Sequence, residues 1–190
     1  VANLHGLCNP PGYACGYWVQ TASNFGWLVC PEGNARCGAQ AFNAPTWEES
    51  FAQMDADLER AIARVDEEHP GEVSRDAAIL TGFSRGAMAA VWIAQAHPGR
   101  WPYLILNEAD VTLDARALRK AGVRAVALLA GEWGTQIAGE RKTAEALRAA
   151  GYPAKLWPMP KAGHHYSANI EDLMRQAIEY VLSFDEGDAG

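Results

Sequence analysis

The chain has 190 residues, of which 49% are apolar and 21% are charged, and this composition predicts one globular domain with a full core over residues 1–190. The net charge of −7 argues against nucleic acid and anionic membrane surfaces as partners, and no apolar run approaches the length of a membrane span. Because the chain opens on Val1-Ala2-Asn3-Leu4, without an initiator Met or a signal peptide, we expect a mature or trimmed form.

The N-terminal segment contains two expected strands, over residues 1–4 and 27–30, and all four cysteines. Cys8, Cys15, Cys30 and Cys37 include no C-x-x-C motif and have only His5 nearby, which argues against a zinc or redox site. An even number of cysteines clustered in loops favours two disulfides and a secreted or periplasmic protein, against the alternative of free buried thiols in a cytosolic one. Of three possible connectivities we predict Cys8–Cys15 with Cys30–Cys37, because each bond would close one loop.

The middle of the chain reads as helix, strand, helix. Residues 47–68 carry an apolar stripe at helical spacing that includes Phe51, Met54 and Leu58, with Thr46 and Glu49 as the expected capping box. A buried strand over residues 77–81 follows, and then an Ala-rich helix from about residue 85 to 97 that a Pro-Gly pair stops.

Between this strand and this helix lies Gly82-Phe83-Ser84-Arg85-Gly86, a G-x-S-x-G pattern. A Ser on such a tight turn exposes its hydroxyl on a strained backbone, and the flanking glycines avoid clashes with the neighbouring strand and helix. The five letters alone would occur by chance in roughly one chain in ten of this length, but their setting makes Ser84 the expected nucleophile rather than a plain helix N-cap.

The rest of the chain continues the alternation, with strands expected at 103–106, 125–130 and 155–159 and helices at 114–121, 140–150 and 170–184. This pattern predicts an α/β fold, a three-layer αβα sandwich with a mostly parallel sheet of about six strands. No repeat, linker or insertion large enough for a lid domain interrupts it, so we expect an open active site.

Polar side chains follow the carboxyl ends of the expected strands, where ligands bind in open α/β sheets. A Ser nucleophile needs a base within hydrogen-bond reach, and histidine suits this role. We expect His164, after a small-residue turn, to be the base in preference to His165. For the carboxylate that orients the base we prefer Glu132, although it also reads as a plain loop acid, and we keep Glu108 and Asp110 as alternatives.

Two backbone amides are needed to hold the developing oxyanion. One is expected from Arg85, directly after the nucleophile, and the other from the loop after the first strand, at Leu7 or Cys8. Phe83 and Trp133 are the expected substrate-binding residues because both lie at the reactive strand ends, although plain packing is an alternative for Trp133.

In the expected order, Leu4-His5-Gly6, Gly82–Gly86, Gly131-Glu132 and Ala162-Gly163-His164 match pieces of the α/β-hydrolase superfamily, which the chain resembles. It is similar to minimal, lidless esterases of the cutinase, dienelactone-hydrolase and carboxylesterase type. This resemblance implies a core without the superfamily's two leading strands and a Ser-His-acid triad. One departure is Gly134, which stands where many relatives carry an Asp.

These observations together predict a serine hydrolase that cleaves a small-molecule or polymeric carboxylic ester through an acyl-enzyme, without a metal or organic cofactor. A thioesterase or peptidase on the same triad is one alternative. A binding protein of the same fold with impaired catalysis is another, because of Gly134.

Overall fold

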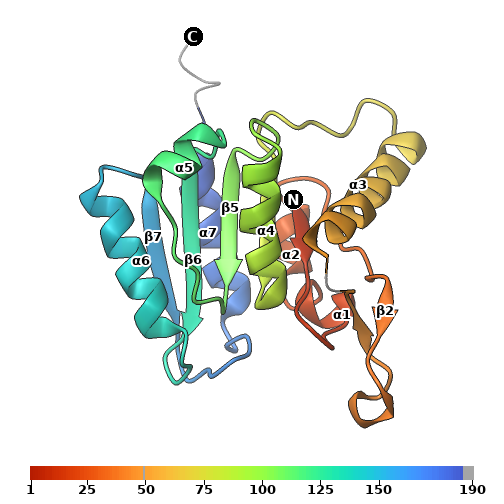
Figure 1. The fold of residues 1–190 in the computed structure, drawn as a ribbon. Helices are drawn as coiled ribbons and strands as arrows, with labels where there is room; N and C mark the ends of the chain where they lie inside the picture. The colour runs from red at the N-terminus through yellow and green to blue at the C-terminus, as the bar shows by residue number, and fades with distance from the viewer. Residues whose placement is uncertain (49, 186–190) are drawn as a thin grey trace.

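A five-stranded parallel sheet forms the centre of the computed structural model, which describes residues 1–48 and 50–185 (Figure 1). The strand order is β1-β4-β5-β6-β7, and every neighbouring pair is parallel. The strands are β1 (Ala2–Leu4), β4 (Ile79–Phe83), β5 (Tyr103–Asn107), β6 (Ala125–Gly131) and β7 (Ala154–Met159). Their carboxyl ends meet at one edge of the sheet, which is the lower edge in Figure 1.

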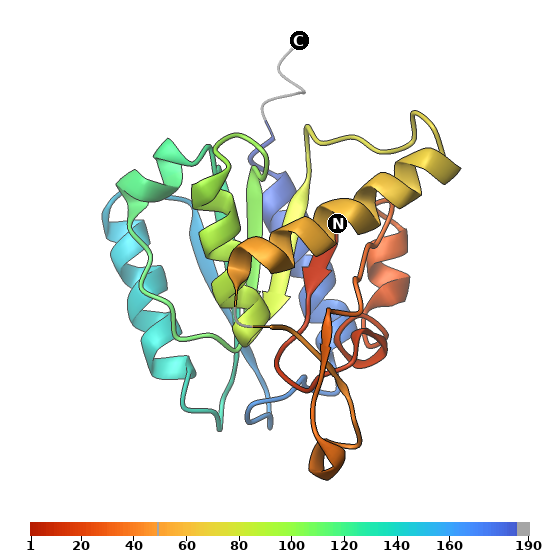
Figure 2. The same ribbon diagram turned by 45° about the vertical axis from the view of Figure 1, so that its right-hand side comes forward.

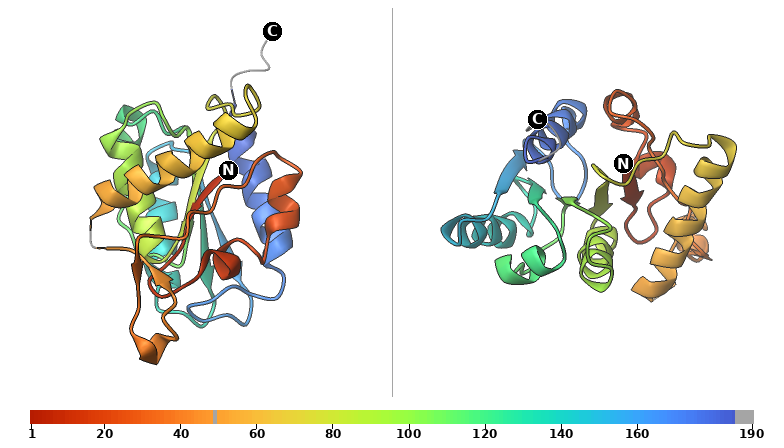
Figure 3. Two further views of the ribbon diagram at one scale, coloured as in Figure 1. Left: turned by 90° about the vertical axis from the view of Figure 1, so that its right-hand side faces the viewer. Right: turned by 90° about the horizontal axis from the view of Figure 1, so that it is seen from above.

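Helices cover both faces of this sheet, which confirms the predicted three-layer architecture (Figure 3, right). One layer consists of α3 (Phe51–Glu68), α4 (Arg85–Ala96), α5 (Ala115–Lys120) and α6 (Ile137–Ala149). The other consists of α2 (Val19–Ser23) and α7 (Ile170–Leu182). The remaining elements are α1 (Pro11–Ala14), the 3-10 turn η1 (Ala39–Ala41) and a small antiparallel hairpin of β2 (Ala35–Arg36) and β3 (Pro45–Thr46). Among the described residues, we find no helix with the length and apolar character to cross a membrane.

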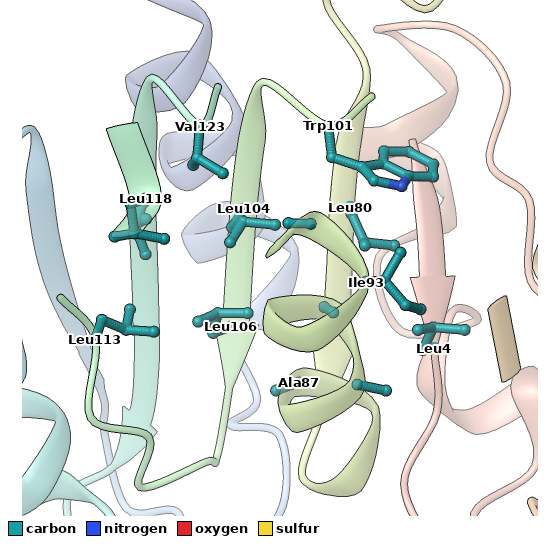
Figure 4. Packing of buried hydrophobic residues seen from close by; sticks show 14 of the residues in the cluster. Leu4, Leu80, Ala87, Ile93, Trp101, Leu104, Leu106, Leu113, Leu118 and Val123 are labelled. Carbon is teal, nitrogen blue, oxygen red and sulfur yellow. The ribbon is translucent and has the colours of Figure 1, made fainter. Parts of the chain in front are cut away.

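Successive side chains of each strand point to opposite faces of the sheet, and this alternation divides the core into two clusters. In β5, Leu104 and Leu106 belong to the cluster under α4, in which Ile93 lies beside Leu80 and Leu4 (Figure 4), while Tyr103 and Ile105 face α7. These four β5 residues are fully buried, so β5 belongs to the core on both of its faces.

Two local predictions differ from the structure. The expected strand at residues 27–30 contributes only a single parallel bridge between Val29 and Ala2, so the large sheet has five strands. Helix α3 begins at Phe51, capped by the Ser50 hydroxyl, which accepts from the Gln53 amide at 3.4 Å. Thr46 lies instead in β3, and Glu49, the other half of the expected capping box, is outside the described residues.

The cysteines form two disulfides, as predicted, but the predicted pairing is wrong. The bonds are Cys8–Cys37 and Cys15–Cys30. The bridge between Val29 and Ala2 brings the returning chain alongside β1, so each cysteine after β1 meets a cysteine of the returning segment rather than its sequence neighbour. Each bond therefore joins the segment after β1 to the returning segment, instead of closing a loop within one segment.

Candidate active site

Ser84 lies on a sharp turn between β4 and α4, with a left-handed φ of 53°. The glycines on either side permit this turn. A Cβ at Gly82 would overlap the backbone of Gly86, and a Cβ at Gly86 would overlap the carbonyl group of Leu4. The Ser84 amide donates to the Asn107 carbonyl at 2.8 Å, which fixes the turn to the end of β5. The hydroxyl is therefore presented at the carboxyl edge of the sheet, in the geometry of a nucleophile elbow.

The loop after β1 passes directly over this turn. A Cβ at Gly6 would lie 3.2 Å from Phe83 Cδ1 and 3.3 Å from Ser84 Cβ, so the loop passes in close contact with the turn. The Cys8 amide already donates to Thr46 Oγ1 at 3.2 Å, which favours Leu7 as the amide facing a substrate. Arg85 is the first residue of α4, and amides of a first helical turn point out of the helix N-terminus.

His164 follows β7 and contacts the carboxylate of Glu108, with 3.2 Å between Nδ1 and Oε2. A carboxylate accepts from Nδ1–H, which leaves the lone pair of Nε2 available to take a proton. Ser84 and His164 line the same cleft but form no hydrogen bond to each other in the described structure. In free enzymes such bonds are often long and tighten only when substrate binds.

Glu108 is fully buried directly after β5, in a left-handed conformation with φ of 55°. This turn aims its carboxylate across the sheet edge, where Oε1 accepts from the Gly131 amide and Oε2 faces His164. Burial raises the pKa of Glu108, and the bonds from Gly131 and His164 partly offset this effect. The carboxylate is thus shielded from water and held by two partners.

The other predicted residues lie elsewhere. Glu132 is exposed, and its carboxylate accepts from the Lys161 amide at 3.3 Å, so the structure does not bring our preferred acid to His164. Asp110 packs against the backbone at Gly139 in α6. Both ring nitrogens of His165 are engaged within its own loop, Nε2 by the Gly163 amide and Nδ1 by the Tyr166 carbonyl.

Gly134, where the sequence departs from the superfamily pattern, lies beside the carboxylate of Glu108. A Cβ at Gly134 would lie 3.4 Å from Glu108 Oε2. The side chain of an acid at residue 134 would therefore start next to the Glu108 carboxylate. The position where the resembled superfamily often carries an Asp is thus next to the carboxylate that contacts His164.

Glu140 is a buried carboxyl group behind this site that sequence reasoning missed. It projects from α6, and its Oε1 accepts from the Ala109 amide at 2.7 Å, one residue after Glu108. Its Oε2 has no partner in the described structure. Burial, and to a lesser degree the charges of Glu108 and Asp110, raise the pKa of Glu140 to about 9. Its burial could have been predicted from its position, because Glu140 lies on the same face of the helix as the apolar residues Ala144 and Leu147.

A cleft of about 500 Å³ opens over Ser84. Its lining residues are Gly6, Leu7, Cys8, Asn9, Pro10, Tyr13, Phe83, Ser84 and His164. The lining contains no Asp, Glu, Lys or Arg, so it fits an uncharged substrate. Phe83 lines the cleft and packs against the His164 ring at 5.1 Å. Trp133 is outside this lining, on the exposed loop after β6.

Comparisons of the sequence with known families and with curated proteins give no match. The structure is similar to three solved structures over nearly the whole chain. These are esterase PE8 (18% identity, 95% of this chain and 91% of that chain, TM-score 0.71), SOBER1 from Arabidopsis thaliana (14%, 95% and 97%, 0.64) and a monoacylglycerol lipase from Paleococcus ferrophilus (14%, 96% and 93%, 0.62). The chain therefore has the α/β-hydrolase fold that its motifs imply.

Proposed function

We propose that this protein is a serine hydrolase of carboxylic esters, with Ser84, His164 and Glu108 as its triad. The observation that carries the proposal is the contact between His164 Nδ1 and the buried Glu108 carboxylate, in a cleft that also exposes Ser84. These three residues follow three different strands. A histidine with a purely structural role would need neither a buried carboxylate at Nδ1 nor a serine with a strained backbone in the same cleft.

In the proposed reaction, Ser84 Oγ attacks the ester carbonyl while His164 Nε2 takes its proton. Glu108 keeps the imidazole oriented and stabilises its charged form. The amides of Leu7 and Arg85 hold the oxyanion. His164 then returns the proton to the leaving alcohol, and water attacks the acyl-enzyme with the same histidine as base. An open cleft without charged lining residues favours neutral esters over charged substrates.

An active-site-directed fluorophosphonate probe tests the nucleophile. We expect it to label Ser84 of the folded protein and to leave Ser84→Ala unlabelled. Hydrolysis of p-nitrophenyl butyrate should fall by about 10⁴-fold or more in Ser84→Ala and in His164→Ala. If the folded protein neither labels nor turns over this ester, a binding protein of the same fold becomes the better description.

A further inference from the structure

The β2–β3 hairpin extends beyond the carboxyl edge of the sheet, past the end of the molecule that holds the candidate active site (Figures 1 and 2). The turn η1 forms its tip, and Phe42 follows directly as the C-terminal cap of that turn. The Phe42 side chain is 96% exposed, the highest fraction among the large apolar residues of the described chain. Such a side chain contributes almost nothing to the core.

The tip is ordered by its own hydrogen bonds. The Asn43 amide donates to the Gly38 carbonyl at 3.3 Å, and the Ala44 amide donates to the Ala41 carbonyl at 2.9 Å. Phe42 and Asn43 both adopt left-handed conformations, with φ of 54° and 50°. This backbone is unfavourable for a bulky residue such as Phe. The hairpin therefore accepts backbone strain at the residue whose apolar side chain it exposes.

The base of the hairpin is fastened to the wall of the cleft. Cys37 is bonded to Cys8, which lines the cleft. On the other strand, Thr46 Oγ1 accepts from the Cys8 amide, and the indole of the next residue, Trp47, donates to the His5 carbonyl at 2.9 Å. The hairpin and the loop over Ser84 thus form one cross-linked unit. A surface that binds the tip would therefore lie at a defined position relative to the cleft.

The chemistry of the tip is uncharged. From Cys37 to Trp47 no residue is Asp, Glu, Lys or Arg, in a chain with a net charge of −7. Leu7, on the wall of the cleft, is 55% exposed, and Trp133, on the loop after β6, is 71% exposed. The tip therefore offers an apolar contact without a cationic residue, which fits a neutral apolar surface and disfavours an anionic one.

We propose that the β2–β3 hairpin docks the protein, through Phe42, on the surface of aggregated neutral ester, so that the cleft faces ester molecules in that surface. This inference rests on the proposed esterase function and adds the physical state of the substrate. Burial of one Phe side chain contributes about ten- to hundredfold in affinity for such a surface.

The test uses one ester, the glycerol triester tributyrin, below and above its solubility limit. For Phe42→Ser we expect hydrolysis of dissolved tributyrin within about twofold of the parent, and hydrolysis of emulsified tributyrin at limiting surface area reduced by about tenfold or more. The matched control is Phe25→Ser, an exposed Phe that lines a cavity at the amino end of the strands, which should leave both rates unchanged. Thermal melts establish that both variants are folded.

Flotation in a sucrose solution denser than tributyrin measures docking without catalysis, and the parent should float with the droplets while Phe42→Ser stays in solution. Unchanged flotation and emulsion rates in Phe42→Ser would overturn the inference, as would an equal loss on dissolved and emulsified ester. Binding to anionic phospholipid vesicles that depends equally on Phe42 would also contradict it. So would a dimer of the parent, seen by sedimentation, that the substitution converts to monomer. A parent that floats but hydrolyses neither form refutes the proposed function and leaves the docking inference supported.

Discussion

The buried carboxyl of Glu140 makes stability depend on pH in a way that one substitution removes. Because burial raises the pKa of Glu140 from the ordinary 4.5 to about 9, the folded protein holds one more proton than the unfolded chain between these values. Stability therefore falls as pH rises through this window, by about 1.4 kcal/mol per pH unit. At pH 7 the accumulated cost is about 3 kcal/mol. In Glu140→Gln, which is neutral at every pH and still accepts from the Ala109 amide, this cost disappears.

Thermal unfolding of the parent and of Glu140→Gln, measured from pH 5 to pH 9, checks this reasoning. Near pH 5 the two proteins should melt within a few degrees of each other. At pH 7 the variant should melt about 6–12 °C higher, and the gap should widen further toward pH 9. Glu145→Gln, an exposed glutamate on the same helix, is the control, and its difference from the parent should not change with pH. A gap between Glu140→Gln and the parent that stays constant with pH would refute the argument.

Three further predictions concern the site itself. Glu108→Gln should lower kcat for a soluble ester by about 10³- to 10⁴-fold, whereas Glu132→Gln should stay within about twofold of the parent, and the reverse ranking would remove Glu108 from the triad. Combining Glu108→Ala with Gly134→Asp should recover at least about tenfold of the rate lost in Glu108→Ala alone, because the new carboxylate starts beside the vacated place. No recovery would contradict the idea that an acid at residue 134 can replace Glu108. Replacing Cys8 and Cys37 together by Ser should lower the free energy of unfolding, measured by urea denaturation, by about 3–4 kcal/mol. It should also reduce kcat, because the loop over Ser84 is no longer bonded to the hairpin. An unchanged kcat would show that the bond serves stability alone.

Several features of this protein follow from the sequence because they depend on neighbouring residues. The strand–turn–helix around Ser84 is encoded by an apolar run, two glycines and an Ala-rich helix within about twenty residues. The alternation of strands and helices is likewise local, and it predicts the parallel sheet and its two helical layers. Because the carboxyl ends of parallel strands share one edge, the sequence predicts that the loops with Ser84 and His164 lie at the same site, and both residues line one cleft.

Only the tertiary structure decided between candidates that the local sequence left open. Glu108 and Glu132 each follow a strand at the same edge, and only the left-handed turn at Glu108 and the space beside Gly134 bring the former to His164. The disulfide pairing depends on the bridge between residues far apart in sequence, which no spacing rule reports. In both cases the partner is selected by how segments far apart in the sequence lie beside one another. Sequence patterns specify the helices and strands and their buried faces, whereas contacts between particular loop side chains arise only when the packed core fixes the loops relative to one another.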